Sequence, residues 1–292
     1  MHEHSDHPQI IWQTRTREFD LTRRGIVMGV LNVTPDSFSD GGRYSKVDSA
    51  LAHAQAMLAQ GAEIIDVGGE STRPGAEAVD ENEELLRVMP IIERLSKLEG
   101  HGGRFVVSID TMKPAVARAA MSAGASVIND VGGFRDDAML AAAKDSRAGV
   151  VVMHMQGEPR TMQGDPRYDC DDVCAAVRDF FCASLLRCIA SGVPAAATAF
   201  DPGIGFGKTT AHNLVLLRHT WEIALPGHAL AVGVSRKSFI GKVTGSAAME
   251  DREWPTVALT CHARANGARI FRVHDVKPNV EALRMTEAIL GT

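Results

Sequence analysis

Residues 27–42 read Val27-Met28-Gly29-Val30-Leu31-Asn32-Val33-Thr34-Pro35-Asp36-Ser37-Phe38-Ser39-Asp40-Gly41-Gly42. The short apolar run at the start is typical of a strand buried on both faces, and it ends at Asn32, where a loop rich in Asp, Ser, Pro and Gly begins. Turn chemistry accounts for Pro35 and Gly41 but leaves Phe38 in a polar loop unexplained. The same event, an apolar run that ends on a polar residue, recurs along the chain, and this repetition decides the fold.

Further apolar runs predict strands that end near Asp66, Asp110, Asn129, Met153, Asp201, Ser235 and His274. Ala- and Leu-rich segments between them predict helices, among them residues 48–60, 82–98, 114–123, 171–190 and 213–224. Pro114 suits a first helical turn, whereas Gly61, Gly124 and Gly192 follow predicted helix ends.

Eight strand–helix units in about 250 residues favour an α/β fold of the (β/α)8 TIM-barrel type, with its site at the carboxyl ends of the strands. A doubly wound open sheet is the alternative. It needs fewer strands or a second domain, and no Pro- or Ser-rich linker divides the chain.

The composition limits the classes of function. The chain has 292 residues, of which 45% are hydrophobic and 23% charged, as in ordinary globular proteins. Its net charge of −5 gives no support to nucleic-acid binding, and no apolar run is long enough for a membrane span or a signal peptide. We therefore expect a soluble cytoplasmic protein. The five cysteines match neither a zinc motif nor a redox motif.

The N-terminal residues are expected to lie outside the barrel. We assign residues 1–18 to a flexible extension and residues 19–292 to the barrel domain, and we assign no role to His2, His4 and His7. Residues 10–21 alternate in a way that predicts a hairpin capping the bottom of the fold.

Polar residues at successive strand ends predict a shared pocket. A single buried Asp110 or Asn129 is more often a structural hydrogen-bonding group, but repetition at the same level favours a ligand site. Met153 would supply an apolar wall, and His154 is left without a role. After the strand near residue 66, Thr72 and Arg73 offer a hydroxyl and a planar guanidinium suited to an anion.

The segment from Asp201 to Thr209 resembles the end of a P-loop but does not match it. The nucleotide-binding pattern requires Gly at position 202, where this chain has Pro, so we exclude an ATPase. Asp201 followed by a glycine-rich loop with Phe206 instead suits a flat heterocycle. Arg272 and His274 share one face of the last strand, where many barrels bind phosphate.

Eight motifs in order carry a resemblance to the dihydropteroate synthase family of folate biosynthesis, a family of pterin-binding TIM barrels. They are NVTPDSFSDGG, DVGGESTRP, SIDT, INDV, MHMQG, DPGIGFGK, SRKS and RVHDV, and the resemblance extends from Phe19 to the C-terminus. It implies a transferase that joins p-aminobenzoate to 6-hydroxymethyl-7,8-dihydropterin diphosphate and releases pyrophosphate with Mg²⁺. It also implies a homodimer and a target of sulfonamides.

The resemblance also implies the residues of the site, and the strand-end pattern agrees with it for Asp110, Asn129 and Asp201. Pterin-binding residues are Asp110, Asn129, Met153, Asp201, Phe206, Gly233 and Lys237. Residues for p-aminobenzoate are Phe38, Thr72, Arg73, Pro74, Ser235 and Lys237. The diphosphate set is Asn32, Thr72, Arg73, Arg272 and His274, with Asn32 also on the Mg²⁺ side, and the catalytic set is Lys237, Asp110, Arg272 and His274.

Two alternatives remain open. A pterin-dependent methyltransferase that serves a corrinoid would share the Asp and Asn anchors but has no need of a diphosphate site, so Arg272 and His274 speak against it. A non-catalytic pterin-binding paralogue would normally have lost these loop residues. For the synthase reaction, we expect a dissociative path, because carboxylates surround the ring and no base is aimed at the amine.

Overall fold

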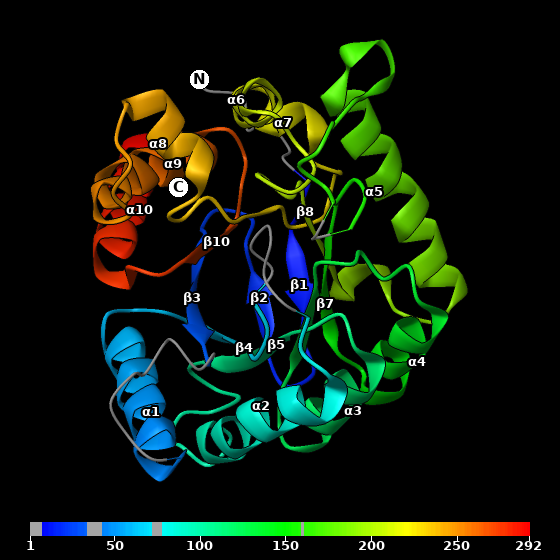
Figure 1. Ribbon diagram of the computed structural model, residues 1–292, viewed down its shortest axis with the longest axis vertical. Helices are drawn as coiled ribbons and strands as arrows, with labels where there is room; N and C mark the ends of the chain where they lie inside the picture. The colour runs from blue at the N-terminus through cyan, green and yellow to red at the C-terminus, as the bar shows by residue number, and fades with distance from the viewer. Residues whose placement is uncertain (1–7, 34–42, 72–77, 159–160) are drawn as a thin grey trace.

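Eight parallel strands form the central barrel of the computed structural model, which describes residues 8–33, 43–71, 78–158 and 161–292. The strands follow the order β8-β7-β6-β5-β4-β3-β10-β9. A parallel bridge between Phe200 and Leu230 links the two outer strands of this order, so the sheet is nearly closed. Figure 1 shows the helices as a ring around the strands. The predicted (β/α)8 barrel is confirmed.

The strands of the barrel are β3 (Ile26–Asn32), β4 (Ile64–Gly68), β5 (Val106–Asp110), β6 (Val127–Asp130), β7 (Gly149–Met153), β8 (Thr198–Asp201), β9 (Ala231–Val232) and β10 (Ile270–Val273). The helices are α1 (Arg43–Ala59), α2 (Glu81–Leu95), α3 (Pro114–Ser122), α4 (Asp137–Ser146), α5 (Val173–Ala190), α6 (Thr210–Arg218), α7 (Thr220–Ile223), α8 (Ser238–Thr244), α9 (Glu253–Ala265) and α10 (Val276–Leu290). Short 3-10 turns cover Asp169–Asp171, Ala195–Ala197 and Glu250–Arg252.

The predicted strand and helix ends agree closely with these bounds. β3, β5, β7 and β8 end at the predicted residues, and the three predicted helix-ending glycines, Gly61, Gly124 and Gly192, all have positive φ. The seventh strand is shorter than expected, because β9 ends at Val232 and not near Ser235. Residues 213–224 form two helices, α6 and α7, in place of one.

Strand alternation divides the core into two parts. In β4, Ile65 and Val67 pack in the cluster between barrel and helices, whereas Ile64 packs inside the barrel with residues such as Val106 and Val127. Asp66 and Gly68 share the face of Ile64, so the barrel interior changes from apolar to polar towards the carboxyl ends of the strands.

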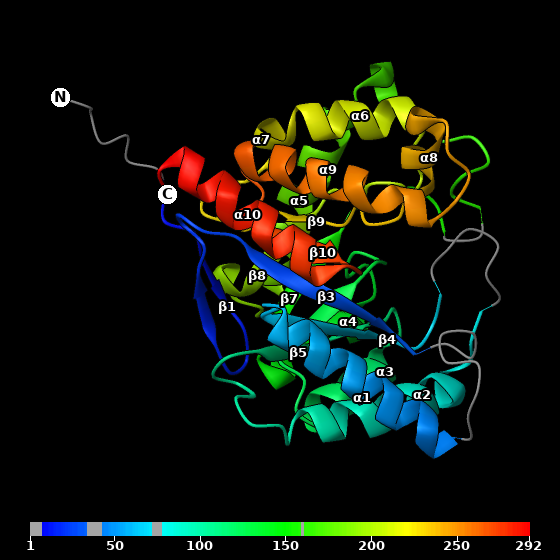
Figure 2. The same cartoon turned by 90° about the vertical axis from the view of Figure 1, so that its left-hand side faces the viewer.

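An antiparallel hairpin of β1 (Ile11–Gln13) and β2 (Glu18–Asp20) closes the apolar end of the barrel. Trp12 and Phe19 are stacked and fully buried, and the Trp12 Nε1 donates to the Ala197 carbonyl oxygen at 3.0 Å. In Figure 2 this hairpin lies at one end of β3 and the loops after the strands lie at the other. The predicted hairpin is confirmed, and the prediction of a flexible extension is therefore wrong for residues 11–18.

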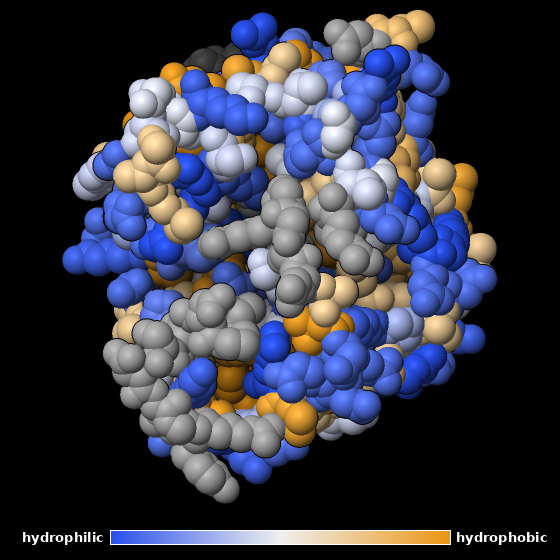
Figure 3. Space-filling view, viewed as in Figure 1, coloured by the Kyte–Doolittle hydropathy of each residue, from blue (hydrophilic) through white to orange (hydrophobic). Residues whose placement is uncertain are grey.

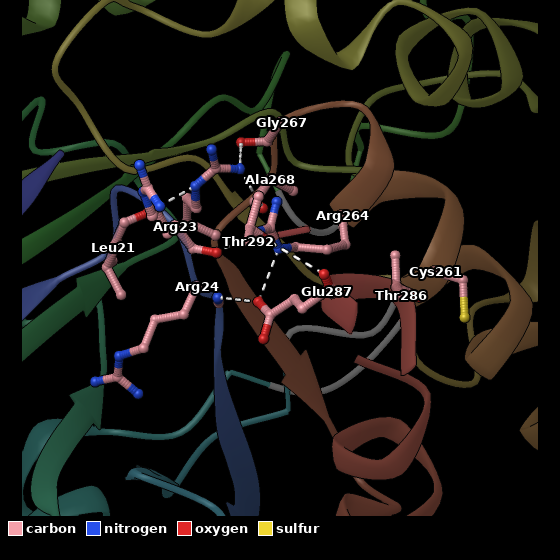
Figure 4. Close-up of polar contacts among 12 residues, drawn as sticks. Leu21, Arg23, Arg24, Cys261, Arg264, Gly267, Ala268, Thr286, Glu287 and Thr292 are labelled. Carbon is pink, nitrogen blue, oxygen red and sulfur yellow. Dashed lines mark hydrogen bonds and ion pairs between the residues drawn. The ribbon is translucent and has the colours of Figure 1, made fainter. Parts of the chain in front are cut away.

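The C-terminal helix is fixed at the same apolar end by a buried ion pair, shown in Figure 4. Glu287 of α10 accepts from Arg264 Nε at 2.8 Å and from the Gly25 backbone N–H at 2.5 Å. Arg264, which is only 3% exposed, also donates to the Arg23 carbonyl oxygen at 2.6 Å. This pair joins α9, α10 and the residue that precedes β3. Within the described ranges, no helix has the length and apolar character needed to cross a membrane.

Candidate active site

The carboxyl ends of the strands bring the predicted polar residues together at one end of the barrel. Asp110 of β5 is paired in register with Asn129 of β6, and Met153 of β7 is paired with Asp201 of β8. All four side chains are buried. Hydrophilic residues predominate on this end of the molecule in Figure 3, apart from the residues drawn in grey. The strand ends therefore bring the predicted residues together at one end of the barrel, and their binding of a ligand stays a prediction.

Two carboxylates at these strand ends have raised pKa values. Burial raises the pKa of Asp110 to about 7; Arg272 opposes the shift, and the nearby carboxylate of Asp66 adds to it. Burial also raises the pKa of Asp201, against the effects of Lys237 and of a hydrogen bond from the Gly203 N–H at 2.7 Å. Such carboxyl groups are suited to a ligand that brings hydrogen-bond donors into the pocket.

Lys237 joins the last part of the barrel to the loop after β8. Its Nζ donates to the carbonyl oxygen of Ile204 and lies 4.2 Å from the centroid of the Phe206 ring. Burial lowers the pKa of Lys237 to about 8, and Asp201 opposes that shift. Gly233 is close to Asp201, because a Cβ at that position would lie 3.8 Å from Asp201 Oδ2. A lysine, an aromatic ring and a carboxylate thus share one corner of the site.

Methionines form an apolar wall beside these polar groups. Met153, Met155, Met162 and Val131 make a separate buried cluster, and Phe206 and Met112 pack against it. Methionine side chains adapt their shape and contact aromatic rings favourably. The wall therefore suits the face of a flat ring whose edge is bound by carboxylates.

Arg272 is engaged by two carboxylates inside the barrel. Its Nε donates to Asp66 Oδ2 at 2.6 Å and its Nη2 donates to Asp110 Oδ2 at 2.7 Å. Asn129 Nδ2 donates to the same Asp66 oxygen at 3.0 Å. The guanidinium thus lies among the pterin-side residues in this structure, and its predicted contact with diphosphate stays a prediction.

His274 and Ser235 meet at the ends of the last two strand segments. His274 Nδ1 lies 2.9 Å from Ser235 Oγ, and the His274 backbone N–H donates to the same oxygen at 3.2 Å. Between Ser235 and Lys237, Arg236 has a φ of 60° and forms a two-fold ion pair with Asp275 at 2.7 and 3.1 Å. This ion pair connects the two cationic motifs.

Lys208 is a buried lysine that sequence reasoning left without a role. Its Nζ contacts His154 Nδ1 at 2.9 Å and the carbonyl oxygens of Phe206 at 3.0 Å and His154 at 3.3 Å. Burial, followed by the nearby Lys208, lowers the pKa of His154 to about 3. His154 also packs against Tyr168 and Phe180. Lys208 therefore fastens the loop after β8 to the end of β7.

Phe38, Thr72, Arg73 and Pro74 lie outside the described residues. The described residues on either side of 72–77 are joined by Glu70, which accepts from the Val79 N–H at 3.1 Å and from Lys113 Nζ. Lys113 also donates to the fully buried Glu84 at 2.5 Å. These carboxylates gave no sequence signal, because only the fold brings Lys113 next to them.

The side chains of Asn32 and Asp110 both approach Gly68 at the end of β4. A Cβ on Gly68 would lie 3.6 Å from Asn32 Oδ1 and 3.5 Å from Asp110 Oδ2, so each side chain brings an oxygen to this part of the strand ends. No cluster of three or more His, Cys, Asp or Glu suited to a metal occurs in the parts of the chain that the structure describes. Hard oxygen donors in small number suit Mg²⁺ that is held mainly by water and substrate phosphate.

Asp66 is the clearest site residue that the sequence did not reveal. Its position in a strand suggested only a strand end, yet it is fully buried and bonds both Arg272 and Asn129. The available signal was an acidic residue two positions before the glycines of a buried strand. That signal identifies no partner across the barrel.

Comparisons with known proteins agree with this geometry. The model of the family described as "Pterin binding enzyme" matches residues 28–274. A dihydropteroate synthase of Escherichia coli K12 is 46% identical over 267 residues, which cover 91% of this chain and 92% of the relative.

Two solved structures are similar throughout. A Xanthomonas albilineans dihydropteroate synthase with 4-aminobenzoic acid has a TM-score of 0.88 and 42% identity, covering 97% of this chain and 99% of its own. A Burkholderia cenocepacia dihydropteroate synthase complexed with 7,8-dihydropteroate has a TM-score of 0.86 and 41% identity, covering 97% and 98%. The family model spans the barrel from β3 to the end of β10 and includes the strand ends that carry these carboxylates. The chain therefore belongs to the pterin binding enzyme family.

Proposed function

We propose that this chain is a dihydropteroate synthase, a transferase of folate synthesis. It condenses p-aminobenzoate with 6-hydroxymethyl-7,8-dihydropterin diphosphate to 7,8-dihydropteroate and pyrophosphate. The observation that carries the proposal is the convergence of Asp110, Asn129, Asp201 and Lys237 at one end of the barrel, beside a methionine wall. The E. coli relative, with the same activity in its name, supports it.

The pterin ring is bound by its edge and its face. A carboxylate such as Asp201 accepts two hydrogen bonds from the amidine-like edge of the ring, and Lys237 donates to the carbonyl side. Met153 and Phe206 supply apolar surface next to these groups. The edge contacts orient the ring so that its exocyclic methylene faces the second substrate.

The diphosphate is the leaving group, and cations stabilise the charge that it takes away. His274 beside Ser235, together with Arg73 and Arg272, is the set that we assign to it. The arylamine of p-aminobenzoate is already neutral near pH 7, so its attack requires no strong base. Ser235, Lys237 and the residues at 38 and 72–74 make up the proposed p-aminobenzoate side.

A pyrophosphate-release assay tests this function. The purified chain should release pyrophosphate from the pterin diphosphate only when p-aminobenzoate is present, and a sulfonamide should compete with p-aminobenzoate. Methyl transfer to a corrinoid without pyrophosphate release would favour the methyltransferase alternative. Pterin binding without either reaction would favour the non-catalytic paralogue.

We also propose that Mg²⁺ binds with the diphosphate on the Asn32 side of the pocket. When bound, the ion neutralises charge on the departing diphosphate. The pair of oxygens from Asn32 and Asp110 near Gly68 supports this placement. Chelation with EDTA should abolish turnover and added Mg²⁺ should restore it, whereas binding of the free pterin ring should persist without the ion.

A dissociative order of bond breaking and making is part of the proposal. The buried carboxylates of Asp110 and Asp201 would stabilise a cationic dihydropterin methylene after diphosphate leaves. The single-turnover rate should then vary little across para-substituted anilines of similar size. A steep dependence of that rate on amine basicity would contradict the dissociative order.

The assembly we propose is a homodimer in the cytoplasm. The neighbouring helices α6–α9 expose large apolar side chains, including Trp221 and Trp254, which are 63% and 74% exposed. All five cysteines are unbridged, as is usual in a reducing compartment. Sedimentation should show a dimer that Trp254→Glu weakens and that Leu86→Glu, on α2, leaves intact.

A further inference from the structure

Asp66 lies one layer below the pocket, inside the barrel. It is the third residue of β4 and is paired in register with Val30 of β3 and Ser108 of β5. Asp110 and Asn129, the predicted pterin residues, lie nearer the carboxyl ends of the next two strands. Asp66 is fully buried, so it reaches a ligand only through other side chains.

One oxygen of Asp66 accepts a hydrogen bond from each of two side chains. Oδ2 accepts from Asn129 Nδ2 at 3.0 Å and from Arg272 Nε at 2.6 Å. An amide whose nitrogen is held by a carboxylate cannot turn over, because the reversed amide would place its oxygen against the carboxylate. Asn129 is therefore fixed with one N–H towards Asp66, and its oxygen and second N–H remain for the pocket.

Arg272 is held in the same way. Its Nε is bound by Asp66 while its Nη2 is bound by Asp110 at 2.7 Å, so the guanidinium is fixed between two carboxylates from neighbouring strands. Without Asp66, the guanidinium would lose its ion pair at Nε, and the second carboxylate alone would determine its position. One buried residue thus supports two residues of the site.

Stability alone does not account for this carboxylate. Its other oxygen, Oδ1, makes no hydrogen bond within the described residues, and neither does Ser108 Oγ on the adjacent strand. Unpaired buried polar atoms destabilise the folded state, and buried ion pairs are often no better for stability than apolar residues of similar volume. A role in the site is the simpler reason for an acid at this position.

We propose that Asp66 is a positioning residue that fixes the Asn129 amide and the Arg272 guanidinium, and so determines which hydrogen bonds the pocket offers to the pterin ring. The proposal rests on the assignment of Asn129 to the pterin. Asp66 never touches the substrate. Its loss should weaken recognition of the ring and leave recognition of p-aminobenzoate nearly unchanged.

Calorimetric binding of 6-hydroxymethylpterin, which has no diphosphate, tests the proposal on the full chain. Asp66→Ala should weaken the Kd by at least about tenfold, because the amide and the guanidinium lose their common acceptor. Asp66→Asn should stay within about threefold of the parent chain, because its amide oxygen still accepts from both groups. Ser108→Ala, a buried polar change in the same layer, is the matched control and should change the Kd less than about twofold.

Steady-state kinetics give the second measurement. Asp66→Ala should raise the KM for the pterin diphosphate by about tenfold and that for p-aminobenzoate by less than about twofold. Asp66→Leu, which keeps the branched shape of the side chain and removes both oxygens, replaces Asp66→Ala if the latter fails to fold. Asp66→Ala and Asn129→Ala should combine to less than the product of their separate effects on the Kd.

Equal Kd values for Asp66→Ala and Ser108→Ala would overturn the proposal, and so would strict additivity with Asn129→Ala. These outcomes concern ring binding alone. If the parent chain binds the ring but releases no pyrophosphate with p-aminobenzoate, the proposed synthase activity fails, and the binding experiment still decides the role of Asp66.

Discussion

At the scale of single residues, the site depends on buried groups whose charge is costly. Lys237 lies over the Phe206 ring and next to Asp201, and burial lowers its pKa to about 8. Asp110 shows the opposite shift for the same reason, since burial disfavours its anionic form. Both groups are therefore in a range where their charge changes near neutral pH.

Replacing Lys237 should remove a donor that the pterin carbonyl needs. We expect Lys237→Ala to lower kcat/KM by about a hundredfold, which is the typical effect of deleting one hydrogen-bond donor that stabilises charge in the transition state. Lys242→Ala, an exposed lysine in the next helix, should change kcat/KM less than about twofold. Equal losses of kcat/KM in the two variants, at equal thermal stability, would show that Lys237 does not act in the site.

The pH profile should report both shifted groups. Because the Lys237 pKa is lowered to about 8, its ammonium is lost as the pH rises through 8, and kcat/KM for the pterin diphosphate should fall above that pH. Because the Asp110 pKa is raised to about 7, its carboxylate is lost as the pH falls below 7. Lys237→Arg should move the alkaline limb upwards by more than a pH unit, and an unmoved limb would assign it to another group.

At the scale of elements, the loop between β8 and α6 is shaped by close backbone contacts. Gly203 has a φ of 64°, and a Cβ there would overlap the carbonyl oxygen of His154. Lys208 binds the same carbonyl and that of Phe206, so the loop is fastened to the end of β7. The position of Phe206 thus depends on an interaction between two loops.

Gly203→Ala should therefore displace the loop and weaken pterin binding. Gly245→Ala is the matched control, since Gly245 has a similar φ of 76° but no atom of the described residues within 4 Å of its Cβ position. The control should lose only about 1 kcal/mol of unfolding free energy, measured in urea, because a side chain at positive φ strains the backbone. Gly203→Ala should lose more unfolding free energy than the control and should raise the KM for the pterin diphosphate. Equal results for the two variants would show that the loop accommodates a Cβ next to the His154 carbonyl.

The ion pair between α9 and α10 should matter for stability but not for turnover. Glu287→Ala would leave Arg264 buried without its carboxylate, which typically costs about 3–5 kcal/mol. Glu281→Ala, on the same helix, breaks an exposed pair with Lys277 at 4.0 Å and should cost less than about 1 kcal/mol. Urea unfolding measures both, and a large loss of kcat/KM in folded Glu287→Ala would contradict a purely structural role.

At the scale of the whole molecule, residues that stabilise the fold and residues of the site lie at opposite ends of the barrel. The hairpin with Trp12 and Phe19, and the pair of Arg264 and Glu287, lie at the amino ends of the strands. The pocket residues lie at the carboxyl ends. This division explains why substitutions at the two ends should affect different measurements.

The sequence by itself determined the barrel and most of the pocket wall. Apolar runs that end on Asp or Asn predict strands and their carboxyl ends, because parallel strands buried on both faces read as nearly continuous apolar runs. Asp110, Asn129, Met153 and Asp201 could therefore be placed at one end before the structure. The hairpin was also visible, since alternation is a local signal, although its close packing through Trp12 was not.

Only the tertiary structure decided the partners of the charged residues. Arg272 and Asp66 are 206 positions apart, and Lys113 binds Glu70, which follows β4, and Glu84 of α2. No periodicity encodes such pairs, because the closure of the barrel and the reach of long side chains set them. The same holds for Lys208 under the β8 loop, which the sequence offered only as part of a motif. Local pattern fixes which end of a strand is polar, and packing fixes which atom each polar group meets.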